Sequence, residues 1–333
     1  MKPKHYNIPI FLPELSCPHR CVFCNQQKIS GTQKVPSAGQ VKSIIDKHLT
    51  TIKSYKNTNI AFFGGSFTGL PLEMQKEYLS VARPYITQKK VSGIRLSTRP
   101  DYIDRENLAV LREYGVQTIE LGAQSFDKDV LKLSQRGHNI DDTERAARLI
   151  KSMGFELGLQ MMIGLPGDNP TKAMHTAQEI VRLEADSTRI YPTLVIKDTA
   201  LARFYKEKKY DPMSIPEAVK LTKELSIYFE KHNVTILRVG LHPSEDLNYN
   251  KSLLAGPYHP SFNELVLTER WNDILQNAFV DKQPGNYRLS VNPKQLNYAV
   301  GYKSKNSNTL AKQGFSLSFI PDSSVRNFKL KFD

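Results

Sequence analysis

The stretch Cys17-Pro18-His19-Arg20-Cys21-Val22-Phe23-Cys24 decides how the rest of this sequence is interpreted. It contains the only three cysteines of the chain, spaced C-x3-C-x2-C, with an aromatic residue directly before the last one. Three closely spaced thiolates can hold three irons of a [4Fe–4S] cluster, which leaves the fourth iron without a protein ligand. Such an iron can take a small chelating ligand and pass it one electron. The spacing therefore predicts a cluster site with Cys17, Cys21 and Cys24 as metal ligands.

Two other uses of three cysteines compete with this prediction. A disulfide framework fits poorly, because an odd number leaves one thiol over and the N-terminal sequence does not resemble a secretory signal. A structural zinc site normally has four ligands, and His19 is the nearest candidate for the fourth. However, His19 lies between two of the cysteines, and the paired C-x2-C…C-x2-C pattern is missing. Reduced thiols without a targeting segment predict a cytoplasmic protein.

The composition predicts a globular protein with a polyanionic partner. Of 333 residues, 40% are hydrophobic and 24% charged. No run approaches the ~18–20 apolar residues of a membrane span, so we expect no membrane association. Lysine and arginine outnumber the acids by 46 to 33, and the net charge is +13. From residue 282 to the end, nine cations stand against two anions, which gives this segment +7. Such a segment suits RNA, although a basic surface that is simply solvated has the same composition.

Short β-rich apolar runs alternate with longer amphipathic ones up to about residue 240. The strand-like runs are 8–12, 60–63, 94–97, 118–121, 157–163, 189–195 and, as a seventh, 235–239. Apolar residues at helical spacing lie between them, for example Val41, Ile45 and Leu49. This alternation predicts parallel βαβ units. We therefore expect an α/β fold, a partial (β/α)6 TIM-like barrel, with its site at the C-terminal ends of the strands.

Polar or glycine-rich residues gather at the end of nearly every one of these runs, as a site at the strand ends requires. In chain order they are the cysteine segment, Gly64-Gly65, Ser97 to Arg99, Gly122 to Ser125, Gln160 to Gly167 and Tyr191 to Thr193. Glycine lets backbone groups approach a ligand without a Cβ in the way, and strand-end amides can bond hydroxyl groups. The strand ends therefore predict one binding site that also includes the cysteines.

The alternation weakens after about residue 240, and we expect two domains. Residues 1–240 would form the core barrel and residues 241–333 a basic accessory segment. The last part has a strand, helix, strand pattern over 287–291, 293–310 and 315–320, which predicts a small α+β extension. We expect its cations to face the same side as the barrel mouth, because a polyanion would have to reach both.

Together these runs resemble the radical S-adenosylmethionine (SAM) superfamily, in the group with the elongator catalytic subunit and the oxygen-independent coproporphyrinogen oxidase. Besides the cysteines, the resemblance rests on residues 62–67, 120–126, 136–138, 164–167 and 189–196. The last of these runs is closest to the elongator branch. Elongator catalytic subunits carry an acetyltransferase domain after the radical domain, and we expect this chain to lack one.

The resemblance implies that the three cysteines ligate a [4Fe–4S] cluster and that SAM binds beside it. It further implies that Gly64 and Gly65 meet the methionine part of SAM and that Arg136 holds its carboxylate. The ordinary alternatives are a tight turn for the glycines and a surface position for the arginine.

Five further side chains are candidate contacts of SAM. They are Phe23 for the adenine, Gln124 and Gln160 for ribose hydroxyls, and Ser97 and Arg99 at a neighbouring strand end. Phe23 could instead cover the cluster, and each glutamine could be a satisfied core amide. Gln160 falls where the porphyrin branch carries an aspartate, so the ribose contact differs from that branch.

These observations predict an enzyme that cleaves SAM reductively to a 5′-deoxyadenosyl radical and acts on RNA, first of all tRNA. By analogy, its reductant would be a flavodoxin or a ferredoxin. Two alternatives stay open: a radical enzyme acting on a small molecule or tetrapyrrole, and a non-catalytic module that binds the cluster and SAM.

Overall fold

The computed structural model describes residues 6–12, 21–25, 28–29, 34–52, 56–241, 247–249 and 251–333. The chain divides into two compact units, of which the first comprises residues 1–213 and 228–257. The second comprises residues 214–227 and 258–333. The domain boundary at residue 240, and the side to which the C-terminal cations face, stay predictions.

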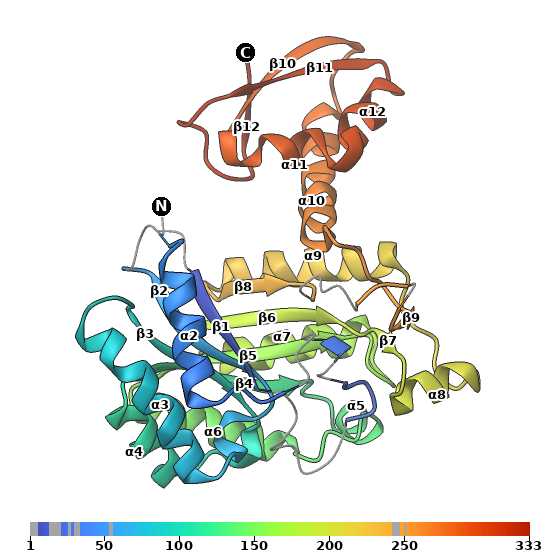
Figure 1. Ribbon diagram of the computed structural model, residues 1–333. Helices are drawn as coiled ribbons and strands as arrows, with labels where there is room; N and C mark the ends of the chain where they lie inside the picture. The colour runs from blue at the N-terminus through green and yellow to red at the C-terminus, as the bar shows by residue number, and fades with distance from the viewer. Residues whose placement is uncertain are drawn as a thin grey trace. The chain divides into compact units, whose positions relative to one another are not determined.

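The first unit is built on one parallel sheet of seven strands, in the order β1-β2-β3-β4-β5-β6-β8. Its strands are β1 (Tyr6–Leu12), β2 (Thr58–Gly64), β3 (Gly93–Thr98), β4 (Val116–Gln124), β5 (Glu156–Ile163), β6 (Ser187–Pro192) and β8 (Thr235–Val239). Figure 1 shows this sheet as a curved surface rather than a closed ring. The predicted α/β fold with a partial barrel is therefore confirmed, and the seventh run is part of the sheet.

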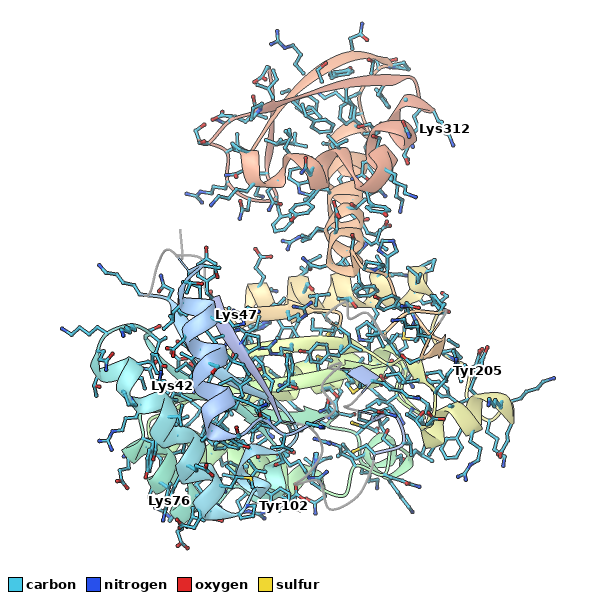
Figure 2. The ribbon with its side chains drawn as sticks, in the orientation of Figure 1. Lys42, Lys47, Lys76, Tyr102, Tyr205 and Lys312 are labelled. Carbon is cyan, nitrogen blue, oxygen red and sulfur yellow. The ribbon has the colours of Figure 1, made fainter. Side chains whose placement is uncertain are left out.

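Helices alternate with these strands, as parallel pairing requires. They are α2 (Ala38–Leu49), α3 (Leu72–Thr87), α4 (Arg105–Glu113), α5 (Lys128–Leu133), α6 (Ile140–Ser152), α7 (Pro170–Arg182), α8 (Ala200–Lys206) and α9 (Ile215–Lys231). Asp104, Asn139 and Asn169 begin α4, α6 and α7, and each accepts a hydrogen bond from a backbone N–H three residues further on. Figure 2 shows Lys42 and Lys47 projecting from α2, where both side chains are exposed.

The run 189–195 was predicted as one strand, and this was wrong. Strand β6 ends at Pro192, which has no N–H to continue a hydrogen-bond ladder. Val195 and Ile196 form a separate strand, β7, which pairs antiparallel with β9 (Leu253–Ala255). The chain therefore leaves the sheet at Pro192, and the second short strand pairs with a later segment of the same unit.

The second unit has the predicted α+β character. Strand β10 (Gly285–Val291) pairs in parallel with β11 (Phe315–Pro321) and antiparallel with β12 (Leu330–Phe332). The long helix α10 (Phe262–Phe279) precedes them.

The single helix predicted over 293–310 was wrong, because two helices occupy this segment. Helix α11 (Leu296–Val300) and helix α12 (Lys305–Ala311) are separated at Gly301, whose φ is +88°. A Cβ at Gly301 would lie 2.8 Å from the backbone nitrogen of Asn306, so the turn needs glycine for its conformation and for its space. Residues 303–309 contain no apolar side chain, so apolar spacing supports a helix only around 296–300, and Gly301 was the available signal for its end.

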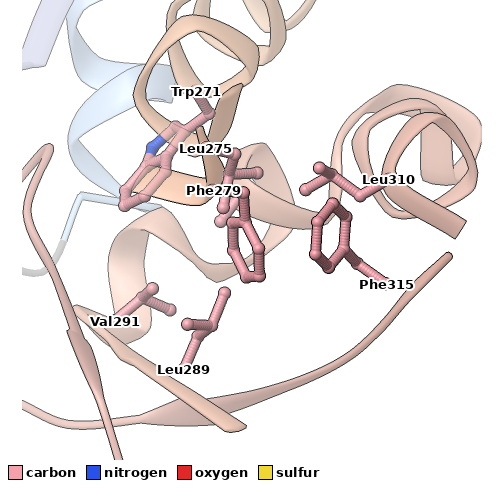
Figure 3. Packing of buried hydrophobic residues seen from close by; sticks show 8 residues of the cluster. Trp271, Leu275, Phe279, Leu289, Val291, Leu310 and Phe315 are labelled. Atoms are coloured by element: carbon pink, nitrogen blue, oxygen red, sulfur yellow. The ribbon is translucent and has the colours of Figure 1, made fainter. Parts of the chain in front are cut away.

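The core of the second unit is aromatic and aliphatic. Its buried members are Trp271, Leu275, Phe279, Leu289, Val291, Ala299, Leu310 and Phe315. Figure 3 shows the side chains of α10 pointing toward those of β10, α12 and β11. Trp271 also donates its indole N–H to the side-chain oxygen of Gln295 at 2.9 Å, so the buried polar end of the ring is satisfied.

No helix in the described part of the chain is long and apolar enough to cross a membrane.

Replacing Leu275 by alanine tests the independence of this core. Leu275 is fully buried, so its truncation should lower the free energy of unfolding of the second unit by about 2–5 kcal/mol. Trp271 is the only tryptophan of the chain and lies in the same core, so its fluorescence during urea unfolding reports this unit. The control is Val280→Ala, since Val280 is 73% exposed and should change the value by less than about 0.5 kcal/mol. Equal effects of the two substitutions would contradict the assigned core.

Candidate functional site

A cavity of about 580 Å³ lies in the first unit where the strand ends meet. It is lined by Asn7, Pro9, Phe11, Phe23, Cys24, Ile29, Phe63, Gly64, Ser97, Gln124, Gln160, Met162, Arg189, Tyr191, Pro192, Leu194, Ile196, Arg238 and Leu241. Six sequence-predicted residues are among them: Phe23, Cys24, Gly64, Ser97, Gln124 and Gln160. Gly65, Arg99 and Arg136 are predicted residues outside this lining. The volume is in the range typical of small-ligand sites.

The cysteine segment is anchored beside this cavity by backbone bonds and apolar packing. Val22 donates its N–H to the Ser134 carbonyl at 3.1 Å and accepts at its own carbonyl from Leu201 at 2.7 Å. The Val22 side chain is buried with Val195 and Leu201. Cys21 is buried, and Cys24 is half-buried at the cavity wall.

The described residues contain no group of three or more His, Cys, Asp or Glu side chains placed to hold a metal. Cys17 and His19 lie outside the described residues. The three-cysteine ligand set therefore stays a prediction.

Arg136 joins the cysteine segment to strand β4. Its Nη1 donates to the Cys21 sulfur at 3.2 Å and its Nη2 donates to the Gly122 carbonyl at 2.7 Å. The Arg136 side chain is 8% exposed, and its Nε has no hydrogen-bond partner among the described residues. Arg136 is therefore a buried cation beside a sulfur, and the surface position considered for it is excluded.

Gln124, whose side chain ends beside Arg136 at Gly122, has strained backbone geometry. Its φ is +69°, a left-handed value that is unusual for a residue with a side chain, and the β4–β5 register shifts between Leu121 and Gln124. A Cβ on Gly122 would lie 2.8 Å from Gln124 Nε2 and 2.6 Å from Arg136 Nη2. Gln124 Oε1 is buried without a hydrogen-bond partner. Backbone strain and an unsatisfied polar atom are both typical of binding sites.

Gly64 ends β2 in a conformation that only glycine adopts easily. Its φ is +110°, and a Cβ there would lie 2.5 Å from the carbonyl oxygen of Leu12. The next residue, Gly65, donates its N–H to this same carbonyl at 2.6 Å. The two glycines therefore hold the ends of β1 and β2 together at the cavity wall.

His138, which follows Arg136 closely, is kept neutral. Burial, together with the charges of Arg136 and Arg99, lowers the pKa of His138 to about 3. Its Nε2 lies 3.3 Å from the Ala123 carbonyl. A neutral imidazole at this place adds no charge beside the Arg136 guanidinium.

Arg99 is held by a neighbour. Its Nε and Nη2 donate to the two carboxylate oxygens of Asp101, each at 2.9 Å. The buried hydroxyls of Ser66 and Thr98 support this loop, because Ser66 Oγ accepts from the Arg99 backbone N–H at 3.1 Å and lies 2.7 Å from Thr98 Oγ1. The contact predicted for Arg99 with a ligand stays a prediction.

The cavity floor contains a buried charge cluster that was not predicted. Glu120 is fully buried and accepts two hydrogen bonds from Arg189, at 2.5 and 3.0 Å. Arg95 Nε lies 3.6 Å from Glu120, and Gln160 Nε2 donates to it at 3.2 Å. Burial alone would raise the pKa of Glu120, but Arg189 and Arg95 hold it below its usual value. The available signal was a charged residue inside each of three strands, Arg95 in β3, Glu120 in β4 and Arg189 in β6.

Comparison with known proteins places this arrangement in a family. A family model described as the radical SAM superfamily matches residues 15–180, and one described as the radical SAM C-terminal domain matches residues 185–271. An uncharacterized protein of Methanocaldococcus jannaschii is 31% identical over 233 residues, which cover 66% of this chain and 70% of that protein. The chain belongs to the radical SAM superfamily. As a radical SAM protein whose relatives include enzymes of this class, it is an enzyme.

Other relatives of this radical SAM enzyme have names that concern tRNA or porphyrin. A tRNA uridine(34) acetyltransferase of Dehalococcoides mccartyi is 32% identical over 128 residues, which cover 38% of this chain and 28% of that protein. The oxygen-independent coproporphyrinogen-III oxidase-like protein HemZ of Bacillus subtilis is 23% identical, with 86% of this chain and 60% of that protein covered.

A solved archaeal Elp3 of Methanocaldococcus infernus has the same fold, with a TM-score of 0.64 and 19% identity. The match covers 80% of this chain and 63% of the Elp3 chain. Matches to the named tRNA acetyltransferases span less than half of their length, at 28%, 48% and 45%.

Asp168, in the loop after β5, provides a pH test of the strand-end geometry. Burial raises its pKa to about 6, although its carboxylate accepts the Gly164 N–H at 2.8 Å. A carboxyl group with a raised folded-state pKa binds more protons in the native state, so stability should fall as pH rises from about 4 to 6. In the wild type the free energy of unfolding should fall by about 2–3 kcal/mol across this pH range, and in Asp168→Asn this fall should be absent.

Thermal unfolding midpoints of wild type and variant, measured between pH 4 and 7, check this expectation. The exposed Asp211, replaced by asparagine, is the control and should leave the wild-type pH profile unchanged. A profile that Asp168→Asn leaves equally steep would contradict the burial of this carboxyl group.

Proposed function

We propose that this enzyme binds a [4Fe–4S] cluster through Cys17, Cys21 and Cys24, cleaves SAM reductively and modifies RNA, first of all tRNA. The observation that carries the first part is the Arg136 side chain, which contacts the Cys21 sulfur with one nitrogen and the Gly122 carbonyl with another.

The residues present fit an iron–sulfur cluster. The Arg136 guanidinium donates a hydrogen bond to the Cys21 sulfur, and it would offset the negative charge that cysteine sulfurs bring to a bound cluster. The same hydrogen bond is of the kind that tunes a cluster from outside its ligand set. His138 is neutral because its pKa is lowered to about 3, so Arg136 is the cation beside the Cys21 sulfur and His138 adds no charge to it.

The residues present also fit SAM. Arg136 Nε and Gln124 Oε1 are buried polar atoms without hydrogen-bond partners among the described residues, on side chains that both end beside Gly122, and a polar ligand would satisfy them. Gly64 presents its backbone at the cavity wall. Gln160 is held by Glu120 and Ser97, so its amide is oriented before any ligand arrives.

The chemistry divides between the bound groups and the chain. When bound, the cluster supplies one electron to SAM, whose cleavage gives a 5′-deoxyadenosyl radical. In this proposal Arg136 orients the SAM carboxylate, Gly64 and Gly65 receive the methionine part, and Gln124 and Gln160 orient the ribose.

Phe23 packs at the adenine and excludes water, and Ser97 and Arg99 support the neighbouring strand end. A flavodoxin or ferredoxin is the proposed reductant. The proposed location is the cytoplasm, where thiols stay reduced.

RNA as the substrate is supported by charge and by the relatives. The last segment carries +7, and several relatives are named tRNA uridine(34) acetyltransferases. Exposed cations of the second unit include Lys303 and Lys312, and Figure 2 shows Lys312 at the end of α12. A small molecule or tetrapyrrole is the second candidate, which the largely apolar lining of the cavity and the relative HemZ favour.

Replacing Gly122 by alanine tests the SAM site. The added Cβ would displace Arg136 and Gln124, so SAM affinity should fall roughly 10- to 100-fold, as expected for a lost hydrogen bond to a charged group. Calorimetric titration of the anaerobically reconstituted protein measures it. Gly39→Ala is the control, because its nearest neighbour would be 3.9 Å away. Unchanged SAM affinity in Gly122→Ala would contradict the assignment of Arg136.

The cluster assignment has its own measurement. Cys21→Ala should abolish both iron and sulfide incorporation and the formation of 5′-deoxyadenosine under dithionite, because a thiolate ligand is lost. Full iron content with partial cleavage would contradict the ligand assignment, and zinc in place of iron in the wild type would contradict the cluster.

The double substitution Lys303→Gln with Lys312→Gln tests the RNA assignment. Each lost phosphate contact should weaken tRNA binding and reduce the slope of log K against log salt by about 0.7–0.9. Fluorescence anisotropy with labelled tRNA at several salt concentrations provides the slopes. Lys47→Gln removes an exposed charge from the first unit as the control. Identical slopes for wild type and the double variant would argue against RNA contact by this surface.

A further inference from the structure

Two arginines lie side by side in the cavity on neighbouring parallel strands. Arg189 of β6 pairs in register with Gln160 of β5 on one side and with Arg238 of β8 on the other. Residues in register on adjacent strands point to the same face of a sheet. All three side chains line the cavity, so this row crosses three strands and faces the same space.

The two arginines of this row, Arg189 and Arg238, carry more positive charge than the carboxylates of the described residues around them compensate. The Glu120 carboxylate accepts both of its arginine hydrogen bonds from Arg189, and Arg95 shares the same carboxylate at 3.6 Å. Arg238 therefore stands beside a second arginine without a carboxylate of its own, since the described cavity lining contains none. Like charges in register on adjacent strands are destabilising unless a counter-charge is supplied.

The Arg238 guanidinium has donors to spare. Its Nε donates to the Gly240 carbonyl at 3.0 Å, and this is its one side-chain hydrogen bond among the described residues. Burial lowers the pKa of Arg238, and Arg189 lowers it further, although Tyr191 opposes both. Tyr191 lies in the same lining, and its hydroxyl accepts from Arg189 Nη1 at 3.4 Å. A bound oxyanion would supply the missing charge and accept from the two Nη groups.

We propose that Arg238, with Tyr191 and Arg189 beside it, binds a phosphate group of the RNA substrate inside the cavity. This inference rests on the proposed action on RNA and assigns to the same site a contact for one nucleotide. A planar guanidinium suits phosphate, and the cavity is too small to admit a nucleic-acid helix. Phe11 also lines this cavity, and an aromatic ring is a surface on which a base can stack.

The cofactor does not account for this charge. Arg136, next to Cys21, is already the proposed partner of the SAM carboxylate. Arg189 is 7% exposed and its guanidinium is bound to Glu120, so it holds its position beside Arg238. Arg238 is half-buried and makes the contact with the phosphate. Arg238 is therefore a substrate-binding residue in this proposal, and Arg189 is a positioning residue.

The test compares Arg238→Gln, Arg238→Lys and the control Arg203→Gln in anaerobically reconstituted protein. Arg203 is an exposed arginine of α8 outside the cavity lining. Labelled unfractionated tRNA should bind Arg238→Gln roughly 10- to 100-fold more weakly than wild type, as expected for a lost charge-assisted hydrogen bond. Arg238→Lys should recover part of the affinity because it keeps the charge, and Arg203→Gln should match the wild type.

Two further measurements separate this site from its rivals. SAM affinity should be the same in all variants, and a loss in Arg238→Gln would overturn the proposal by assigning Arg238 to the cofactor. Inorganic phosphate should raise the unfolding temperature of the wild type but not of Arg238→Gln. Without phosphate, Arg238→Gln should be at least as stable as the wild type, because the repulsion by Arg189 is gone.

The remaining outcomes distinguish a failure of the proposed RNA function from a failure of the Arg238 assignment. If wild type and Arg238→Gln bind tRNA equally, the proposal is overturned while the RNA function stands. If the wild type does not bind tRNA but phosphate protects it through Arg238, the RNA function fails and the oxyanion site stands. If acetate protects the wild type as well as phosphate does, the phosphate assignment is overturned in favour of a carboxylate substrate.

Discussion

The buried pair of Glu120 and Arg189 is the interaction on which the cavity depends. It connects β4 to β6 across the intervening strand β5, and Gln160 of that strand donates to the same carboxylate. A charge without exposure to water is tolerated only when it is paired and hydrogen-bonded. The pair therefore fixes which residues of three strands face the interior, because a slip by one residue would turn each charge to the other face of the sheet.

The positions of the strands along the chain could be predicted, because each strand is a short apolar run with polar or glycine residues at its end. Strand-end logic correctly brought Phe23, Gly64, Ser97, Gln124 and Gln160 to one cavity. It could not reveal that Glu120 pairs with Arg189, since the two are 69 positions apart and their pairing depends on the register of β4, β5 and β6. The arginine on β8 was missed for the same reason.

Local backbone conformation limited the prediction elsewhere. The turn at Gly301 separates two helices in a segment that has no apolar residue from 303 to 309, and the left-handed Gln124 lies inside what the sequence presents as an ordinary strand end. Both positions have close neighbours in space, Asn306 beside Gly301 and the Arg136 guanidinium beside the Gln124 side chain at Gly122. Patterns of hydrophobicity contain information on faces and periods, but not on such contacts.

Gly122 has a consequence for recognising such sites in other sequences. In an interior strand a glycine weakens packing and is normally disfavoured. Here the space that its side chain would fill is taken by the ends of Arg136 and Gln124. A glycine in a strand, with glutamine two positions later and arginine fourteen positions later, is therefore a sequence pattern that indicates three residues in contact. A substitution at any one of the three positions would change the fit of the other two, so the three should vary together or not at all.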